Sequence, residues 1–343
     1  MSISKNTSNN PNIAILSVIA LLLLMAFLKL AQVIVLPFVL SIFLSFLLLP
    51  IIYFLQKKGV PAIISALFSL GIVFILLFTL SSLLTVSLKS LGQALPSYFE
   101  KFEFLAFEMT HFIKQYGIEL NAKLLLDNID SASVASLAGQ SLSFILGIMK
   151  YSVLVFFITL FMLLESSRFK DKAIKAFGKG NIFDDSTAQV GKEIAQYLGF
   201  KTLMSLTTGI LVWAFLTLMG LDFPLVWGLL AFILNFIPSV GSIVASIPPI
   251  LLALLQFESP FKMFVIVTIG LLLIHISIGN YLDPKIMGDN LNLSTLIIFL
   301  SMVFWGWMWG PLGMLIAVPL AVCIKVALAH NARTKPISIM MED

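Results

Sequence analysis

Cysteine and charge are the two features that this sequence has least of. Its 343 residues include one cysteine, Cys323, and only 11% of them are Asp, Glu, Lys or Arg. A single cysteine excludes an internal disulfide framework. A soluble domain carries about 25% charged residues, because charge has to cover its surface. The shortage of charge therefore argues against a soluble fold, and with it against a cytosolic enzyme or a nucleic-acid-binding protein.

Motifs that carry catalysis or hold cofactors are also missing. The sequence has no pair of cysteines, no His-x-x-x-His, no Gly-x-x-x-x-Gly-Lys-Ser/Thr phosphate loop and no nucleophile elbow. The histidines His111, His275 and His330 are too dispersed to predict a metal site. We therefore expect no enzymatic activity, no cofactor and no metal. Without a phosphate loop, transport would draw on an ion gradient, on the gradient of the solute or on a partner ATPase.

Long apolar runs take up most of the chain. Hydrophobic residues make up 59% of it, against about 45–50% in soluble domains, and the mean hydropathy is +1.06. A helix that crosses a membrane needs about 20 apolar residues. Runs of this character cover residues 13–28, 33–55, 62–88, 142–164, 202–219, 223–257, 263–282 and 291–325. They predict an all-α polytopic membrane protein with about eight transmembrane helices, including broken or re-entrant hairpins, plus amphipathic surface helices.

Basic residues indicate which segments face the cytoplasm. Lys57 and Lys58 follow the second run, a basic stretch follows the fourth, and Arg333 and Lys335 lie near the C-terminus. This pattern places both termini in the cytoplasm. The predicted order is a cytoplasmic tail (1–12), three membrane segments (13–88), an extracytoplasmic amphipathic segment (89–140), a membrane segment (141–165), a basic cytoplasmic segment (166–201), a membrane transport region with bent hairpins (202–328) and a cytoplasmic tail (329–343).

Two segments outside the longest runs repeat their apolar residues at helical spacing. Between Tyr98 and Tyr116 apolar residues recur every three or four positions, and the same spacing is briefer from Val190 to Leu198. We interpret both as amphipathic helices that lie on the membrane surface or against the bundle. A helix that binds a partner is the alternative.

The backbone is interrupted inside two of the apolar runs. The first interruption is Asn235-Phe-Ile-Pro238-Ser239-Val-Gly241-Ser242, with Pro248-Pro249 close behind. Proline disturbs a helix, and glycine lets the chain reverse. Freed backbone groups must be buried in protein or line a watery cavity, and broken helices of this kind build solute sites in transporters. A plain interfacial turn between two spans is the alternative.

The second interruption is Trp305-Gly-Trp-Met-Trp-Gly310-Pro311-Leu-Gly313. Its glycines and proline predict another bend. Its three tryptophans predict an interfacial aromatic belt at one depth.

Ionisable residues inside a membrane segment are functional candidates by default. His275, Gly279 and Asp283 are spaced by four residues, which predicts one helical face that carries protons or binds a polar solute. Asn280, Pro284, Lys285 and Gly288 extend this candidate region. The alternative is a histidine that is hydrogen-bonded to a neighbouring helix.

Three further charged residues lie near the ends of apolar runs. Asp222 is either a carboxylate that couples protons or cations to transport, or the cap of the following helix. Lys201 and Lys325 are expected to extend their amino groups toward water.

Several of these strings resemble the autoinducer-2 exporter family of bacterial membrane proteins, the PerM-like permeases. They are the string 235–249, the string Gly279-Asn-Tyr-Leu-Asp-Pro-Lys-Ile-Met-Gly288, and the string 304–319 around the second interruption. Within that family the chain is most similar to the TqsA-like subgroup. The resemblance implies an inner-membrane protein of about eight spans that forms homo-oligomers. Family members are linked to export of autoinducer-2, others to sodium(lithium)/proton antiport, so the resemblance leaves the substrate open.

The sequence thus predicts a secondary transporter or facilitator in the inner membrane that exports autoinducer-2 or a related small polar metabolite. The candidate residues for substrate binding or gating are Asn235, Pro238, Ser239, Gly241, Ser242, His275, Gly279, Asn280, Asp283, Pro284, Lys285 and Gly288, and those for proton or cation coupling are Asp222, Asp283 and His275. A monovalent cation/proton antiporter is the first alternative. A non-transport scaffold or accessory subunit is the second. The expected partners are a small-molecule solute, the lipid bilayer and further copies of the chain, and no nucleic acid.

Overall fold

The protein is an all-α polytopic membrane protein, as predicted. The structure, a computed structural model, describes residues 11–114, 151–165, 172, 185–238, 240–282, 293–329 and 334–342. Every regular element in these residues is a helix: α1 (Pro11–Leu30), α2 (Gln32–Lys57), α3 (Ala62–Lys114), Tyr151–Glu165, α6 (Asp185–Leu218), α7 (Pro224–Leu234), α8 (Val240–Gln256), α9 (Pro260–Ile276), the π-helix η1 (Ser277–Leu282), α11 (Thr295–Ala329) and α12 (Lys335–Met340). Among them α2, α3, α6 and α9 are long and apolar enough to cross a membrane. Helix α11 has the same length and apolar character, but its backbone is not helical at Gly310.

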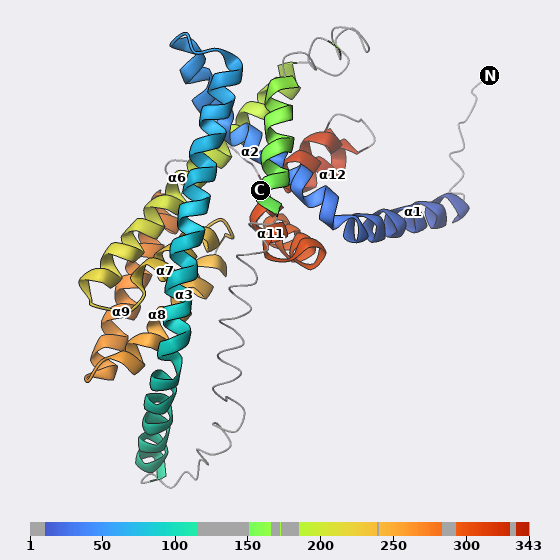
Figure 1. Cartoon of the computed structure of the whole chain (residues 1–343). Coiled ribbons are helices and arrows are strands. Elements are labelled where there is room, and N and C mark those ends of the chain that lie inside the picture. The colour runs from blue at the N-terminus through green and yellow to red at the C-terminus, as the bar shows by residue number, and fades with distance from the viewer. Residues whose placement is uncertain are drawn as a thin grey trace, which may run out of the picture.

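Helix α3, with 53 residues, runs along the bundle and contacts several other helices (Figure 1). Near its start it packs against α2, and further along it contacts α7 and α8. The α7 and α8 helices are joined by a short turn and pack against each other, and α6 and α9 flank them. Helix α11 lies on the other side of the bundle with α12 against it (Figure 1).

Three clusters of buried apolar side chains hold these helices together. The first joins α2, the start of α6, α11 and α12. The second joins α3, the rest of α6, α7, α8 and α9. The third is smaller and packs α2 and α3 against the helix Tyr151–Glu165. The turn between α7 and α8 touches both large clusters, because Leu234 packs against each of them and Ile237 belongs to the first.

Both predicted amphipathic segments continue a membrane helix. The third apolar run and the segment from Tyr98 onward form one 53-residue helix, α3, which runs through Pro96. The segment from Val190 to Leu198 likewise belongs to the 34-residue helix α6. On α6 the side chains of Ile194 and Tyr197 are buried in the first cluster, so this segment packs against the bundle.

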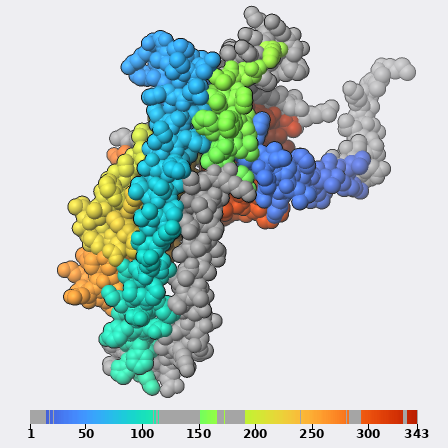
Figure 2. Space-filling model, in the orientation of Figure 1, coloured from blue at the N-terminus to red at the C-terminus, as the bar shows by residue number. Residues whose placement is uncertain are grey.

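Much of the outer surface is apolar. Ile75 and Phe78 on α3 are 69% and 66% exposed. Helix α1 projects from the rest of the described chain, and most of its described side chains are exposed (Figures 1 and 2). A contiguous apolar surface of this size is unfavourable in free energy when it faces water. Lipid acyl chains can cover it without that penalty. The surface is therefore that of a protein whose solvent is lipid.

Candidate functional site

Helices α7 and α8 form a tight hairpin at the first predicted interruption. Helix α7 ends at Leu234, residues 235–238 turn, and α8 begins at Val240. A Cβ atom on Gly241 would lie 1.8 Å from the carbonyl oxygen of Leu234. Since no side chain fits there, the two arms can meet only at a glycine. The predicted reversal at Pro238 and Gly241 is confirmed, and we call residues 235–238 and 240–242 the hairpin tip.

Asn235 fastens the hairpin tip to α6. Its side chain is 9% exposed, and its Nδ2 donates a hydrogen bond to Ser205 Oγ at 3.1 Å. The two helices approach closely beside this bond, because a Cβ atom on Gly209 would lie 2.8 Å from the carbonyl oxygen of Gly228. The backbones of α6 and α7 are thus nearly in contact, and the hairpin tip has a fixed register on α6.

Three buried polar side chains follow one face of α6 next to the hairpin tip. Lys201, Ser205 and Thr208 are 6%, 0% and 0% exposed, and their spacing of four and three residues places them on one stripe. We call them the polar stripe. Toward the N-terminus of α6 this face enters the first apolar cluster, and toward the C-terminus it enters the second. The polar stripe therefore occupies the stretch of α6 between the two cores.

The sequence prediction for Lys201 was wrong. An amino group that reaches water would leave the side chain exposed, but Lys201 is buried in the middle of a continuous helix. Lys325 does not simply extend into water either, because its Nζ lies 3.0 Å from Glu342 Oε1. Ser205 and Thr208 were missed, although the three-four spacing that they share with Lys201 is readable in the sequence.

The second arm of the hairpin adds polar groups of its own. Ser246, 9% exposed, donates a hydrogen bond from Oγ to the carbonyl oxygen of Ser242 at 2.8 Å. Pro248 and Pro249 lie inside α8, where each removes one N–H from the helix. This arm can therefore offer hydroxyl and carbonyl groups to a polar molecule.

Asp222 lies at the opposite end of α7 from Asn235. Its carboxylate accepts a hydrogen bond from the hydroxyl of Tyr98. The predicted capping role is wrong, since Phe223 is the N-cap of α7 and no side chain caps that helix. The structure thus separates Asp222 from the hairpin tip by the length of α7.

The predicted helical face that starts at His275 does not continue as an α-helix beyond Ile276. His275 is half-buried in the last turn of α9, and the π-helix η1 begins at Ser277 and includes Gly279 and the backbone of Asn280. A π-helix has more residues per turn than an α-helix, so a spacing of four no longer keeps Gly279 above His275. Short π-helical segments are frequent at functional sites. Ser239, Asp283, Pro284, Lys285 and Gly288 lie outside the described residues.

Helix α11 is a second hairpin, as its glycines and proline predicted. Gly310 has φ 66° and ψ −151°, which breaks the helix in two. Ser301 Oγ donates a hydrogen bond to the carbonyl oxygen of Ala317 at 2.8 Å, so residues 16 positions apart face each other. A Cβ atom on Gly313 would lie 2.0 Å from the carbonyl oxygen of Trp305, which explains why glycine occupies the inside of this bend.

The predicted belt of three tryptophans is wrong for two of them. Trp305 and Trp309 are buried in the first apolar cluster, with their ring centroids 4.7 Å apart. Only Trp307 of the three is exposed, and Lys29 Nζ lies 3.9 Å from the centroid of its ring. Trp305 and Trp309 therefore pack the second hairpin against the bundle.

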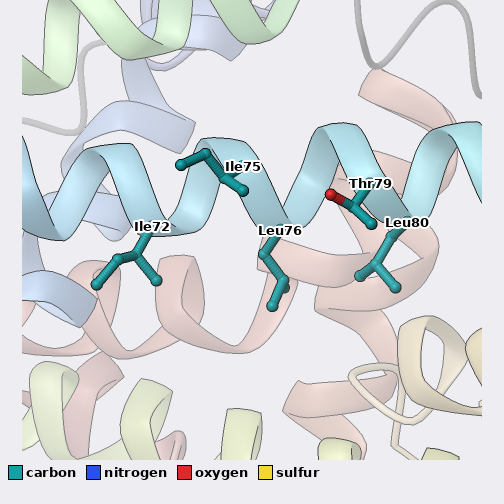
Figure 3. Close-up of a pocket in the computed structure, with 5 residues that line it drawn as sticks. All are labelled: Ile72, Ile75, Leu76, Thr79 and Leu80. Atoms are coloured by element: carbon teal, nitrogen blue, oxygen red, sulfur yellow. The ribbon is translucent and has the colours of Figure 1, made fainter.

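One surface hollow is unsuited to a polar solute. It is lined by Ile72, Ile75, Leu76, Thr79 and Leu80, all from α3 (Figure 3). Four of the five are aliphatic, and the side chains lie on the apolar outer face of the helix. The polar groups that a hydrophilic molecule needs gather instead where the polar stripe meets the hairpin tip.

Comparison with known proteins matches the chain to a family of transporters. The family model for AI-2E family transporters matches residues 15–333. The AI-2 transport protein TqsA of Escherichia coli (strain K12) is 32% identical over 323 residues, which cover 94% of this chain and 93% of that protein. A protein of Borreliella burgdorferi is 35% identical over 333 residues, covering 94% and 88% of the two chains. YhhT of Escherichia coli (strain K12) is 28% identical over 327 residues, covering 95% and 93%. The names of all three refer to transport.

Proposed function

The chain belongs to the AI-2E transporter family, and from that premise we propose that it is an inner-membrane secondary transporter or facilitator that exports autoinducer-2 or a related small polar metabolite. The hydrogen bond between Asn235 and Ser205, next to the buried Lys201, carries this proposal. It marks the place where polar groups of the hairpin and of α6 meet between two apolar cores. Polar groups of this kind recognise a small polar metabolite through hydrogen bonds.

The length of α7 supports a position of the hairpin tip inside the membrane. Eleven residues of helix rise about 16 Å, roughly half of the 30 Å hydrocarbon layer. If the open end of the hairpin lies at the outer surface, as the charge pattern of the sequence predicts, its tip lies near the midplane. Half-helices that end there commonly form the solute sites of transporters.

The charge of the polar stripe favours a neutral or anionic solute. Lys201 supplies a basic side chain, while Ser205, Thr208 and Asn235 supply hydroxyl and amide groups. A sugar-like molecule binds through such hydrogen bonds. An antiporter of sodium or lithium would need a carboxylate in the pathway. Of the two candidate carboxylates, Asp222 is held by Tyr98 at the far end of α7 from the hairpin tip, and Asp283 lies outside the described residues.

Both termini lie on the cytoplasmic side in this proposal. The first hairpin then enters the membrane from the outside and the second from the cytoplasm. Homo-oligomers are part of the proposal, because the family resemblance of the sequence implies them.

Reconstitution tests the proposed function. We expect purified protein in liposomes to move labelled autoinducer-2 at a rate well above that of protein-free vesicles. Imposed proton and sodium gradients identify the coupling: acceleration by one gradient indicates secondary active transport, and no response indicates facilitated diffusion. Vesicles that move no autoinducer-2 and none of its sugar-like analogues would contradict the proposal.

A further inference from the structure

The open end of the first hairpin carries a network of hydrogen bonds that the solute site does not use. Gln256, the last residue of α8, contacts both sides of the turn before α7. Its Oε1 accepts a hydrogen bond from the backbone N–H of Asp222 at 2.8 Å, and its Nε2 donates to the carbonyl oxygen of Gly220 at 2.8 Å. Trp227 Nε1 donates to the carbonyl oxygen of Asp222 at 2.9 Å. These bonds close the hairpin at its base.

Helix α3 holds the same base from outside. The hydroxyl of Tyr98 donates to Asp222 Oδ2, and the side chain of Tyr98 is 8% exposed. One turn further along α3, Lys101 Nζ donates to the carbonyl oxygen of Gln256 at 3.2 Å. Each arm of the hairpin is thus tied to α3, and we call Tyr98, Asp222 and Gln256 the clasp.

The backbone beside the clasp is strained. Phe223 has φ 58° and ψ 39°, a left-handed conformation that a phenylalanine rarely adopts. Such a residue persists only where its surroundings hold it in place. The bonds at the neighbouring Asp222 supply that restraint: it accepts from Tyr98 and Trp227, and its backbone N–H donates to Gln256.

We propose that Tyr98 and Asp222 are positioning residues that fix the angle of the first hairpin on α3 and thereby keep Asn235 in register with Ser205. This inference rests on the proposed function, in which the hairpin tip forms the solute site. A rotation of about 10° at the base moves the end of a 16 Å helix by about 3 Å. A hydrogen bond tolerates only a few tenths of an ångström beyond its usual length, so that rotation would break the bond between Asn235 and Ser205.

The experiment compares Tyr98→Phe, Asp222→Ala and the double variant in liposomes. We expect each single variant to lower the transport rate several-fold and the double variant to be no slower than the slower single one, because both remove the same bond. The dependence of transport on imposed gradients should stay as in the wild type. Tyr53→Phe, which alters an exposed tyrosine of α2, is the control and should transport normally.

Hydrogen exchange of the same proteins provides a readout that does not need transport. The amides of Asn235 and Ile237 donate to the carbonyl oxygens of Ala231 and Leu234. We expect both to exchange faster in Tyr98→Phe, with α9 unchanged. If the wild type moves no solute, faster exchange at the hairpin tip still supports the positioning role while the proposed function fails. Unchanged exchange at the tip, or loss of the gradient response in Asp222→Ala alone, would overturn the inference.

Discussion

Replacing Asn235 with alanine is expected to lower the transport rate by roughly tenfold or more. The variant removes the donor to Ser205 Oγ and with it the bond that fixes the hairpin tip on α6. A buried polar group that loses its partner costs about 1–3 kcal/mol, and 1.4 kcal/mol corresponds to a tenfold change in an equilibrium. The measurement is the initial rate of solute flux per molecule of reconstituted protein, with membrane abundance determined in parallel.

The variant Ser205→Ala distinguishes two roles of Asn235, namely anchoring the hairpin tip and contacting the solute. If Asn235 only anchors the tip, Ser205→Ala will reproduce the effect of Asn235→Ala in full. An asparagine has an amide oxygen and a second N–H that the bond to Ser205 leaves for other partners. We therefore expect Asn235→Ala to be the slower variant and to show the larger rise in apparent KM. Equal losses in the two variants would remove Asn235 from the solute site.

Replacing Lys201 with methionine is expected to have the second large effect. Methionine keeps the length and the apolar stem of lysine but removes the amino group from the polar stripe. If that group attracts a neutral or anionic solute, transport should fall by about tenfold, the equivalent of one charge-assisted hydrogen bond. Flux is expressed per molecule of protein in the membrane, because Lys201 takes part in an interaction and removing one partner of a buried charged interaction also costs stability.

Lys192→Met is the matched control, since Lys192 is exposed on the same helix. It should transport normally. Lys201→Arg should recover part of the activity, because it restores the charge with a different shape. A fall in the abundance of Lys201→Met with normal flux per molecule would assign Lys201 to folding and not to the solute pathway.

Local signals in the sequence predicted the bends of the backbone. Pro238 with Gly241, and Gly310 with Pro311, are residues whose covalent structure restricts or frees the chain, so their effect does not depend on distant neighbours. The apolar runs likewise predicted the helical class and most of the membrane helices, because hydrophobicity over about 20 residues is set by the chain itself.

Long-range contacts could not be predicted. Tyr98 and Asp222 are 124 positions apart, and nothing in the sequence indicates that they meet. A tryptophan beside a glycine occurs both in interfacial belts and in buried cores. The sequence around Trp305 and Trp309 therefore could not distinguish the two. Lys201 was assigned to the end of an apolar run because its neighbours in the folded bundle were unknown. In each case the tertiary packing decided the role of the side chain.

The central claim is that the tip of the first hairpin lies within the membrane and is reached by the solute. It is tested most directly by cysteine labelling of proteoliposomes, with Ser242→Cys or Ile243→Cys introduced into a Cys323→Ser background. Ser242 is half-buried at the tip, whereas Ile243 is 65% exposed on the apolar surface. We predict that a charged, water-soluble thiol reagent labels Ser242→Cys, that autoinducer-2 slows this labelling, and that Ile243→Cys stays unlabelled. A Ser242→Cys variant as unreactive as Ile243→Cys, or one labelled at the same rate with and without solute, would contradict the account.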